Sequence, residues 1–353
     1  MLNPGYTTIS KFLIQQVPEG PHGRELAALL VDVAAVIKAI SAAVGKGPLV
    51  GLAGLAGTDN VQGESQKKLD VLADELFTRG VEWSGLVVAL ASGRREGVHF
   101  VEGHGRLALV FDPLDGSNNL DVNLPVGSIF SVLALPETSR TTEAVLQQGS
   151  RQLAAGYAIY GPSTQVVITV GRGVHGFTLD REIGNFVLTH PDIRVPDEGS
   201  DYLINASNRR FWEPPITRYV DECKAGREGP RGRDFNTRWV ASMVADVHRI
   251  LLRGGIYMYP RDQKAANREG RLRLLYEANP MAMIVEQAGG LASTGRGRIL
   301  DIVPERIHQR VPVVLGTRVE VARVERYHAE FDRGEDKPYS SPLFGERSLF
   351  TNA

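Results

Sequence analysis

Two aspartates three residues apart, followed at once by small polar residues, are the residues in this chain best suited to chemistry. The stretch FDPLDGSNNLD comes after the apolar run LALVF and contains Asp112 and Asp115. Two carboxylates just beyond the end of a buried strand can converge on one divalent cation. Oxygen ligands of this kind suit Mg²⁺, with Mn²⁺ as the other possibility.

The residues around these aspartates supply further oxygen and nitrogen ligands. Pro113 fixes its own φ and restricts Asp112 before it, which can turn the Leu114 carbonyl towards the same ion. Gly116 and Ser117 then offer backbone N–H groups and a hydroxyl to an anion. A metal beside an anion-binding turn is suited to hydrolysis of a phosphate ester. A surface turn closed by an Asx cap is the alternative that the short pattern leaves open.

A second stretch, GRLRLLYEANP, carries a carboxylate and two basic residues. Arg271 and Arg273 alternate with leucines, so both can face one side of a strand, and Glu277 precedes a helix that begins with proline. This arrangement fits a phosphorylated sugar on one side and a metal on the other. A solvated edge strand followed by a helix cap is the competing interpretation.

The rest of the chain predicts the elements that must position these groups. Helices are expected where apolar residues recur at helical spacing, and strands at short continuous apolar runs. The predicted helices are 8–17, 24–44, 64–79, 242–253, 280–288 and 319–331, and the predicted strands are 85–91, 107–111, 126–134, 154–160, 165–170, 176–179, 255–259 and 311–315. The chain is therefore expected to belong to the α/β class in the broad sense, with helices and strands mixed (α+β) along its length. A polar stretch at 191–200 marks a soft boundary between two halves.

Composition excludes several classes of function. The formal net charge of −1 over 353 residues gives no electrostatic reason to expect nucleic acid or an anionic membrane as a partner. A single cysteine excludes an internal disulfide framework and a cysteine-rich zinc site. No unbroken apolar run approaches the ~20 residues that span a bilayer, and the N-terminus lacks the pattern of a secretory signal. A cytoplasmic location is expected.

From about residue 8 to 328 the chain resembles the class I fructose-1,6-bisphosphatases, which belong to the metal-dependent, lithium-sensitive phosphatases. Besides FDPLDGSNN and GRLRLLYEANP, the specific pieces are KKLDVLADEL, AAGYAIYGPST, SMVADVHRIL, GGIYMYP and AGGLASTG. The resemblance implies a layered α-β-α-β-α sandwich and an oligomer, expected to be a homotetramer. It also implies an N-terminal α+β domain over 1–197 and a C-terminal sugar-phosphate domain over 198–335, and the polar composition of the last residues indicates a tail over 336–353.

The resemblance also assigns roles residue by residue. It implies that the metal is held by Asp112, the Leu114 carbonyl, Asp115 and Glu277, and that Asp70, with Glu64 nearby, helps to activate the attacking water. It implies that Arg238 reaches across a subunit interface to the substrate. The other residues that it places around the substrate are Asp115, Gly116, Ser117, Asn118, Asn205, Tyr257, Met258, Tyr259 and Arg271.

One segment departs from the family pattern. Where the family has two glutamates that bind metal and help to deprotonate water, this chain has Gly93 and Arg94, within ASGRREG. Exchanging two carboxylates for a glycine and a guanidinium, which keeps its charge in proteins, weakens any second or third cation site there. A local slip that brings Glu96 inward is the one rescue that the sequence offers.

The resemblance implies hydrolysis of the 1-phosphate of fructose 1,6-bisphosphate to fructose 6-phosphate, in gluconeogenesis or Calvin-type carbon metabolism. The Gly93–Arg94 departure leaves open an impaired paralogue that binds sugar phosphates without turning them over. Another sugar bisphosphatase, such as one acting on sedoheptulose bisphosphate, is a further alternative.

Overall fold

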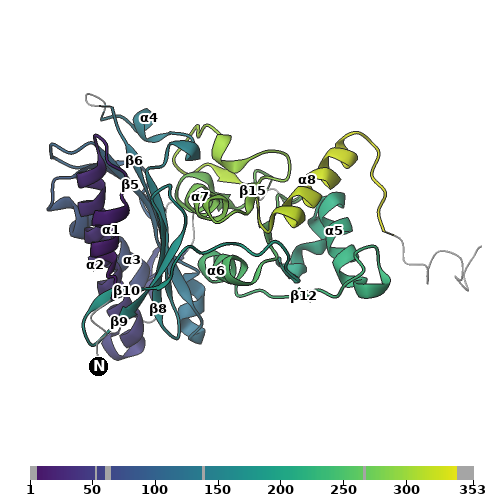
Figure 1. The fold of residues 1–353 in the computed structure, drawn as a ribbon, viewed down its shortest axis with the longest axis horizontal. Coiled ribbons are helices and arrows are strands. Elements are labelled where there is room, and N and C mark those ends of the chain that lie inside the picture. The colour runs from purple at the N-terminus through teal and green to yellow at the C-terminus, as the bar shows by residue number, and fades with distance from the viewer. Residues whose placement is uncertain (1–5, 52–53, 60–64, 137–139, 265–267, 340–353) are drawn as a thin grey trace, which may run out of the picture.

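The computed structural model describes residues 6–51, 54–59, 65–136, 140–264 and 268–339. Within them two large β-sheets stand face to face with helices outside and between them (Figure 1), and two further sheets have two strands each. The order of layers is helices, sheet, helices, sheet, helices. The layered α-β-α-β-α sandwich expected from the sequence is confirmed.

The first sheet has eight strands in the order β10-β9-β8-β7-β6-β5-β3-β4. All neighbouring pairs are antiparallel except β3 and β5, which run parallel. The central strands are buried on both faces, which explains why they read as continuous apolar runs rather than as alternating ones. The strands are β3 (Val87–Ser92), β4 (His99–Phe100), β5 (Leu107–Asp115), β6 (Val126–Ala134), β7 (Ala154–Tyr160), β8 (Thr164–Thr169), β9 (His175–Asp180) and β10 (Asn185–His190).

Helices α1 (Ile9–Gln16), α2 (Gly23–Lys46) and α3 (Lys68–Glu82) cover the outer face of this sheet. Among the described residues, α2 is one helix long and apolar enough to cross a membrane, judged by length and composition alone. It contains no unbroken apolar run of that length, because charged residues, among them Asp32 and Lys38, interrupt its sequence. Its residues Leu29, Val33 and Ile37 are buried in the core that it shares with the first sheet.

The second sheet has five strands in the order β12-β11-β13-β17-β15. Helices α6 and α7 lie between the two sheets, and α5 and α8 cover the far face of the second sheet (Figure 1). The elements of this half are β11 (Asp201–Leu203), α5 (Pro214–Lys224), β12 (Asn236–Thr237), α6 (Met243–Arg253), β13 (Ile256–Tyr259), α7 (Asn279–Gln287), β15 (Leu291–Ser293), β17 (Val313–Gly316) and α8 (Arg318–Asp332).

Small elements complete the fold and carry several site residues. The pair β1 (Leu55–Asp59) and β2 (Ser65–Lys67) leads into α3, and β14 (Leu272–Arg273) pairs with β16 (Arg310–Val311). Single turns of helix occur at Gly47–Val50, Ser117–Val122, Gly149–Arg151, Ala206–Phe211, Gly226–Glu228 and Ile299–Asp301, with a short helix α4 (Thr142–Val145) and a π-helical turn at Leu274–Ala278.

The expected elements differ from the observed ones mainly at their ends. The strand expected at 311–315 is two strands in different sheets, because Pro312 breaks the ladder between β16 and β17. The helix expected from residue 64 begins at Lys68. Strand β10 and helix α5 were not predicted, since their polar residues obscure the pattern. Asp336, at the start of the tail, pairs with Arg218, whereas residues 340–353 lie outside the described part of the chain.

Candidate active site

A bulge in β5 brings the two aspartates to the same side of the sheet. Asp112 lies opposite Ile129 of β6 and Asp115 lies opposite Gly127, so three steps along β5 match two steps along β6. In a regular strand, residues i and i+3 point to opposite faces. The extra residue in β5, at Pro113–Leu114, shifts the alternation of side chains by one position, so that Asp115 points to the same side as Asp112.

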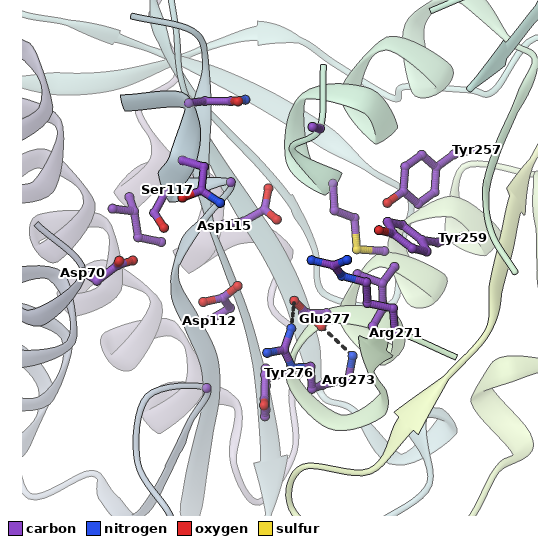
Figure 2. Close-up of a pocket in the computed structure, with 18 of the residues that line it drawn as sticks. Asp70, Asp112, Asp115, Ser117, Tyr257, Tyr259, Arg271, Arg273, Tyr276 and Glu277 are labelled. Atoms are coloured by element: carbon purple, nitrogen blue, oxygen red, sulfur yellow. Dashed lines mark hydrogen bonds and ion pairs between the residues drawn. The ribbon is translucent and has the colours of Figure 1, made fainter. Parts of the chain in front are cut away.

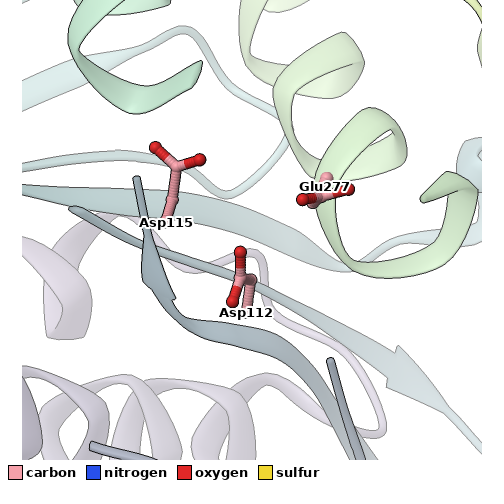
Figure 3. Close-up of side chains that lie close together, drawn as sticks. All are labelled: Asp112, Asp115 and Glu277. Atoms are coloured by element: carbon pink, nitrogen blue, oxygen red, sulfur yellow. The ribbon is translucent and has the colours of Figure 1, made fainter. Parts of the chain in front are cut away.

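Glu277 completes a cluster of three buried carboxylates with Asp112 and Asp115 (Figure 3). One oxygen atom from each residue lies within 4.8 Å of the others. Glu277 comes from the π-helical turn Leu274–Ala278 that precedes α7, an irregularity that often marks functional sites. The structure thus brings together the three side chains expected to hold a metal, from segments about 160 residues apart.

Asp115 is held by the first turn of α6. The Ser242 hydroxyl, which also caps that helix, donates to Asp115 Oδ2 at 2.5 Å, and the Val244 N–H donates to the same oxygen at 3.0 Å. Burial, with a smaller contribution from the neighbouring Asp112 carboxylate, raises the Asp115 pKa to about 6. The ionised form of Asp115 is therefore energetically unfavourable unless a cation lies beside it.

Glu277 is held by the residue four positions before it. The Arg273 backbone N–H donates to Glu277 Oε2 at 2.5 Å, and the Arg273 guanidinium lies 3.6 Å from Oε1 (Figure 2). Burial raises the pKa of Glu277 to about 7 despite this positive charge. Three buried carboxylates, two of them with raised pKa values, form a donor set that fits a hard divalent cation such as Mg²⁺ or Mn²⁺.

A cavity of about 480 Å³ opens beside the carboxylates. On one side it is lined by the turn after β5, with Gly116, Ser117 and Asn118, and on the other by the second sheet and β14 (Figure 2). The predicted residues that line it are Asp70, Asp112, Leu114, Asp115, Gly116, Ser117, Asn118, Asn205, Tyr257, Tyr259, Arg271 and Glu277.

Aromatic rings and a guanidinium form the far end of the cavity. The Trp239 and Tyr257 rings are stacked with centroids 6.0 Å apart, and the Arg271 guanidinium lies 5.7 Å from the centroid of the Tyr259 ring. Arg271 and Arg273 both line the cavity, as expected from their alternation. Flat rings and a guanidinium suit a sugar carrying a second phosphate.

Two predicted residues, Met258 and Arg238, do not line the cavity, and a third, Glu64, is not described. Met258 is fully buried and packs on the opposite face of β13 from its neighbours Tyr257 and Tyr259, so its side chain does not line the cavity. Successive side chains of a strand point to opposite faces, so only those of Tyr257 and Tyr259 are directed towards the cavity. Arg238 is exposed outside the cavity, and Glu64 lies outside the described residues.

Asp70 is placed at the edge of the cavity by the start of α3. As the third residue of that helix it accepts a hydrogen bond from the Lys67 N–H at 2.9 Å. Burial raises its pKa, and the Arg94 guanidinium acts against this shift. The Ser117 hydroxyl also contacts the Asp70 carboxylate, which links the helix to the turn after β5.

Segment 92–96, in which the sequence differs from the family pattern, does not supply a carboxylate to the cavity. Glu96 is exposed, so the inward slip considered from the sequence does not occur. Gly93 and Arg94 both line the cavity. A Cβ atom added at Gly93 would lie 2.9 Å from Tyr276 Cε2, so the tyrosine ring takes the space of a side chain there.

Some site residues were missed by sequence reasoning. Ser242 holds Asp115, and Trp239, Met243 and Tyr276 line the cavity. Ser242 begins a helix as an N-cap, which is a signal in the sequence, but nothing in the sequence shows that the same hydroxyl reaches Asp115. That contact depends on how the two halves pack.

Comparison with known proteins agrees with this geometry. Family models match residues 7–191 (Fructose-1-6-bisphosphatase, N-terminal domain) and residues 195–329 (Fructose-1-6-bisphosphatase, C-terminal domain). The chain is 53% identical to a fructose-1,6-bisphosphatase class 1 of Methylacidiphilum infernorum, over 98% of both chains. It is 51% identical to a fructose-1,6-bisphosphatase class 1 of Methylibium petroleiphilum, over 99% of both.

A solved structure is similar over nearly the whole fold. The crystal structure of Leishmania major fructose-1,6-bisphosphatase in holo form has a TM-score of 0.86 and 40% identity, and the match covers 92% of this chain and all of that one. The layered sandwich and the acidic cavity are those of a sugar phosphatase. Within that class, the chain belongs to the fructose-1,6-bisphosphatase family, class 1.

Proposed function

We propose that this enzyme removes the 1-phosphate of fructose 1,6-bisphosphate, giving fructose 6-phosphate and inorganic phosphate. The observation that carries the proposal is the buried cluster of Asp112, Asp115 and Glu277 beside a cavity with a phosphate-type turn and an arginine, in a chain of this family. Mg²⁺, or Mn²⁺ in its place, would be held by that cluster. Within the cell this activity would serve gluconeogenesis or a Calvin-type cycle in the cytoplasm.

The chain's own residues divide the work at the scissile phosphate. A divalent cation supplies charge neutralisation and a more acidic water when it is bound. The backbone N–H groups and the hydroxyl of Gly116, Ser117 and Asn118 would bind the phosphate oxygens and take up developing negative charge. Asp70, fixed at the start of α3, would orient the attacking water and accept its proton.

The other end of the substrate would lie among the second-sheet residues. Asn205, Tyr257, Tyr259 and Arg271 would contact the sugar and its 6-phosphate, with Arg271 able to give two parallel hydrogen bonds. We propose that Arg238 contacts that phosphate from a neighbouring subunit of a homo-oligomer, taken to be a tetramer. Its exposure on a single chain supports this role.

Phosphate release tests the proposal directly. Purified protein is given fructose 1,6-bisphosphate with Mg²⁺ and, separately, with Mn²⁺, and Asp112→Asn serves as the matched inactive variant. Release that depends on the metal and is abolished in Asp112→Asn supports the proposal. Substrate binding without any release would favour the impaired paralogue, and faster release from sedoheptulose bisphosphate would favour the other bisphosphatase.

A further inference from the structure

The guanidinium of Arg94 lies where carboxylate and carbonyl oxygens converge. One terminal nitrogen, Nη2, donates to Asp70 Oδ1 at 2.8 Å and to the Leu114 carbonyl at 2.8 Å. The same nitrogen lies 3.6 Å from Asp112 Oδ1. Its two hydrogens therefore serve two oxygens, with a third close by, and its charge lies against two carboxylates. The Arg94 side chain is only 14% exposed.

The backbone and the neighbouring side chains hold this loop in place. The Gly93 N–H donates to the Phe111 carbonyl at 3.1 Å, and Arg95 Nε donates to Asp74 Oδ2 at 2.8 Å. On the other side, His308 Nε2 is 3.1 Å from the Glu96 carbonyl. The loop is thus tied to β5, α3 and the C-terminal half, so Arg94 is directed into the cavity by several independent contacts.

A divalent cation and this guanidinium cannot share the same oxygens. A metal would need the Leu114 carbonyl and the two carboxylates at about 2.0–2.6 Å, where the Arg94 nitrogen already lies. The guanidinium keeps its charge in proteins, so it cannot lose a proton to lower its repulsion of a metal ion at these oxygens. The Leu114 carbonyl, predicted as a metal ligand, is instead engaged by Arg94.

We propose that Arg94 is a built-in cation that fills a second cation position between Asp70, Asp112 and the Leu114 carbonyl. The chain then holds a single divalent ion, at Asp112, Asp115 and Glu277. Arg94 is a positioning residue, because it orients Asp70 and neutralises the charge that a second metal would otherwise neutralise. This inference rests on the proposed metal site but not on the identity of the substrate.

Counting bound Mn²⁺ tests the inference without any activity measurement. Metal-free protein is titrated with Mn²⁺, and free Mn²⁺ is followed by electron paramagnetic resonance. The wild type is expected to bind a single Mn²⁺ per chain tightly. Arg94→Glu, which exchanges the cation for a ligand, is expected to gain a second site that binds at least about tenfold more tightly than any second ion of the wild type.

Two further variants separate charge from folding. Arg94→Lys keeps the positive charge and is expected to retain the wild-type count. Arg94→Gln is expected to show a steeper dependence of activity on metal concentration, because a second ion must then neutralise Asp70 and Asp112. Arg79→Gln is the matched control, since Arg79 is an exposed arginine of α3 that pairs with Glu75 outside the cavity, and it should change neither readout.

Several results would overturn the inference. A wild type that binds two or more Mn²⁺ tightly would show that Arg94 excludes nothing. An unchanged count in a folded Arg94→Glu variant, together with an unchanged metal dependence in Arg94→Gln, would do the same. Failure of the proposed function would look different: a single bound Mn²⁺ with no phosphate release leaves this inference standing.

Discussion

At the scale of single residues, burial makes the ionised Asp115 carboxylate unfavourable unless a cation lies beside it. Burial raises the pKa of Asp115 from its ordinary value of 3.8 to about 6, so the folded protein binds a proton there more tightly than the unfolded chain does. Stability from this group is therefore greatest below pH 4 and is lost as pH rises towards 6. Metal-free protein should be less stable at pH 8 than the same fold without this carboxylate.

Asp115→Asn tests this statement. In the presence of a chelator at pH 8 the variant should unfold at a higher temperature than the wild type. Its free energy of unfolding should be larger by an amount on the order of 2–3 kcal/mol at most. At pH 4 the difference should vanish. The variant should also lose phosphatase activity. Asp234→Asn, which changes an exposed carboxylate, is the control and should show no such dependence on pH.

Metal affinity should increase with pH, because the metal binds the carboxylates only after they have lost their protons. Mn²⁺ competes with protons on Asp115 and Glu277, whose pKa values burial raises to about 6 and about 7. The apparent Mn²⁺ affinity should rise about tenfold or more between pH 5.5 and pH 7.5 and level off above that range. Titrations at a series of pH values measure it. An affinity that is flat across this range would mean that neither carboxylate binds the ion.

Sequence reasoning could identify the three carboxylates at this scale but not the groups that hold them. Asp112, Asp115 and Glu277 stand out because their types and their places beside apolar runs are unusual. The Ser242 contact with Asp115 crosses 127 positions, and no local pattern encodes it. The same applies to Arg94: the resemblance implied that two carboxylates are replaced at positions 93 and 94, and the structure shows what the arginine contacts.

At the scale of elements, the turn after β5 depends on a glycine that touches α6. Gly116 has φ of 71°, and a Cβ atom there would lie 2.6 Å from the Ser242 Cβ. Gly116→Ala should therefore displace Ser242, loosen its hydrogen bond to Asp115 and lower stability by roughly 2 kcal/mol or more. Thermal unfolding and Mn²⁺ titration would measure the two effects.

Gly171→Ala is the matched control for that substitution. Gly171 also has a positive φ, 81°, but an added Cβ atom would meet nothing within 4 Å. The backbone strain is therefore shared, and the clash with α6 is present only at Gly116. We expect Gly171→Ala to lose about 1 kcal/mol of stability and no metal affinity. Equal loss of metal affinity in both variants would contradict the role given to the Gly116–Ser242 contact.

The elements themselves were predictable where burial is uniform. Strands β6 and β7 have the bounds expected from their apolar runs. Strand β5 was expected to end at Phe111 but continues to Asp115, because after the bulge β6 still pairs with its polar residues. A polar strand end supported by a neighbour cannot be distinguished from a loop in the sequence.

At the scale of the whole molecule, the site exists only where the two halves meet. Asp112 and Asp115 come from the first sheet, whereas Glu277 and Ser242 come from elements packed between the sheets. The proposed domains 1–197 and 198–335 therefore each carry part of the metal site. Any contribution from a second subunit would add to a site already assembled from both halves of one chain.

Arg238 provides the prediction at this scale. If its guanidinium reaches the substrate of a neighbouring subunit, Arg238→Ala should raise the KM for fructose 1,6-bisphosphate about tenfold or more, since a hydrogen bond to a charged group contributes roughly 1.5–3 kcal/mol. Mn²⁺ affinity should be unchanged, because the carboxylate cluster is untouched. Arg253→Ala, which removes an exposed positive charge at the end of α6, should leave the KM unaltered.

Mixed oligomers distinguish a contact between subunits from one within a chain. Asp112→Asn subunits are inactive but keep Arg238, and Arg238→Ala subunits keep the carboxylates. When the two are unfolded and refolded together, some Arg238→Ala sites should receive the arginine from an Asp112→Asn neighbour, and a component with the wild-type KM should appear. An arginine that acts within its own chain cannot be supplied in this way. In that case the mixture would show only the raised KM, and the role across the interface would be rejected.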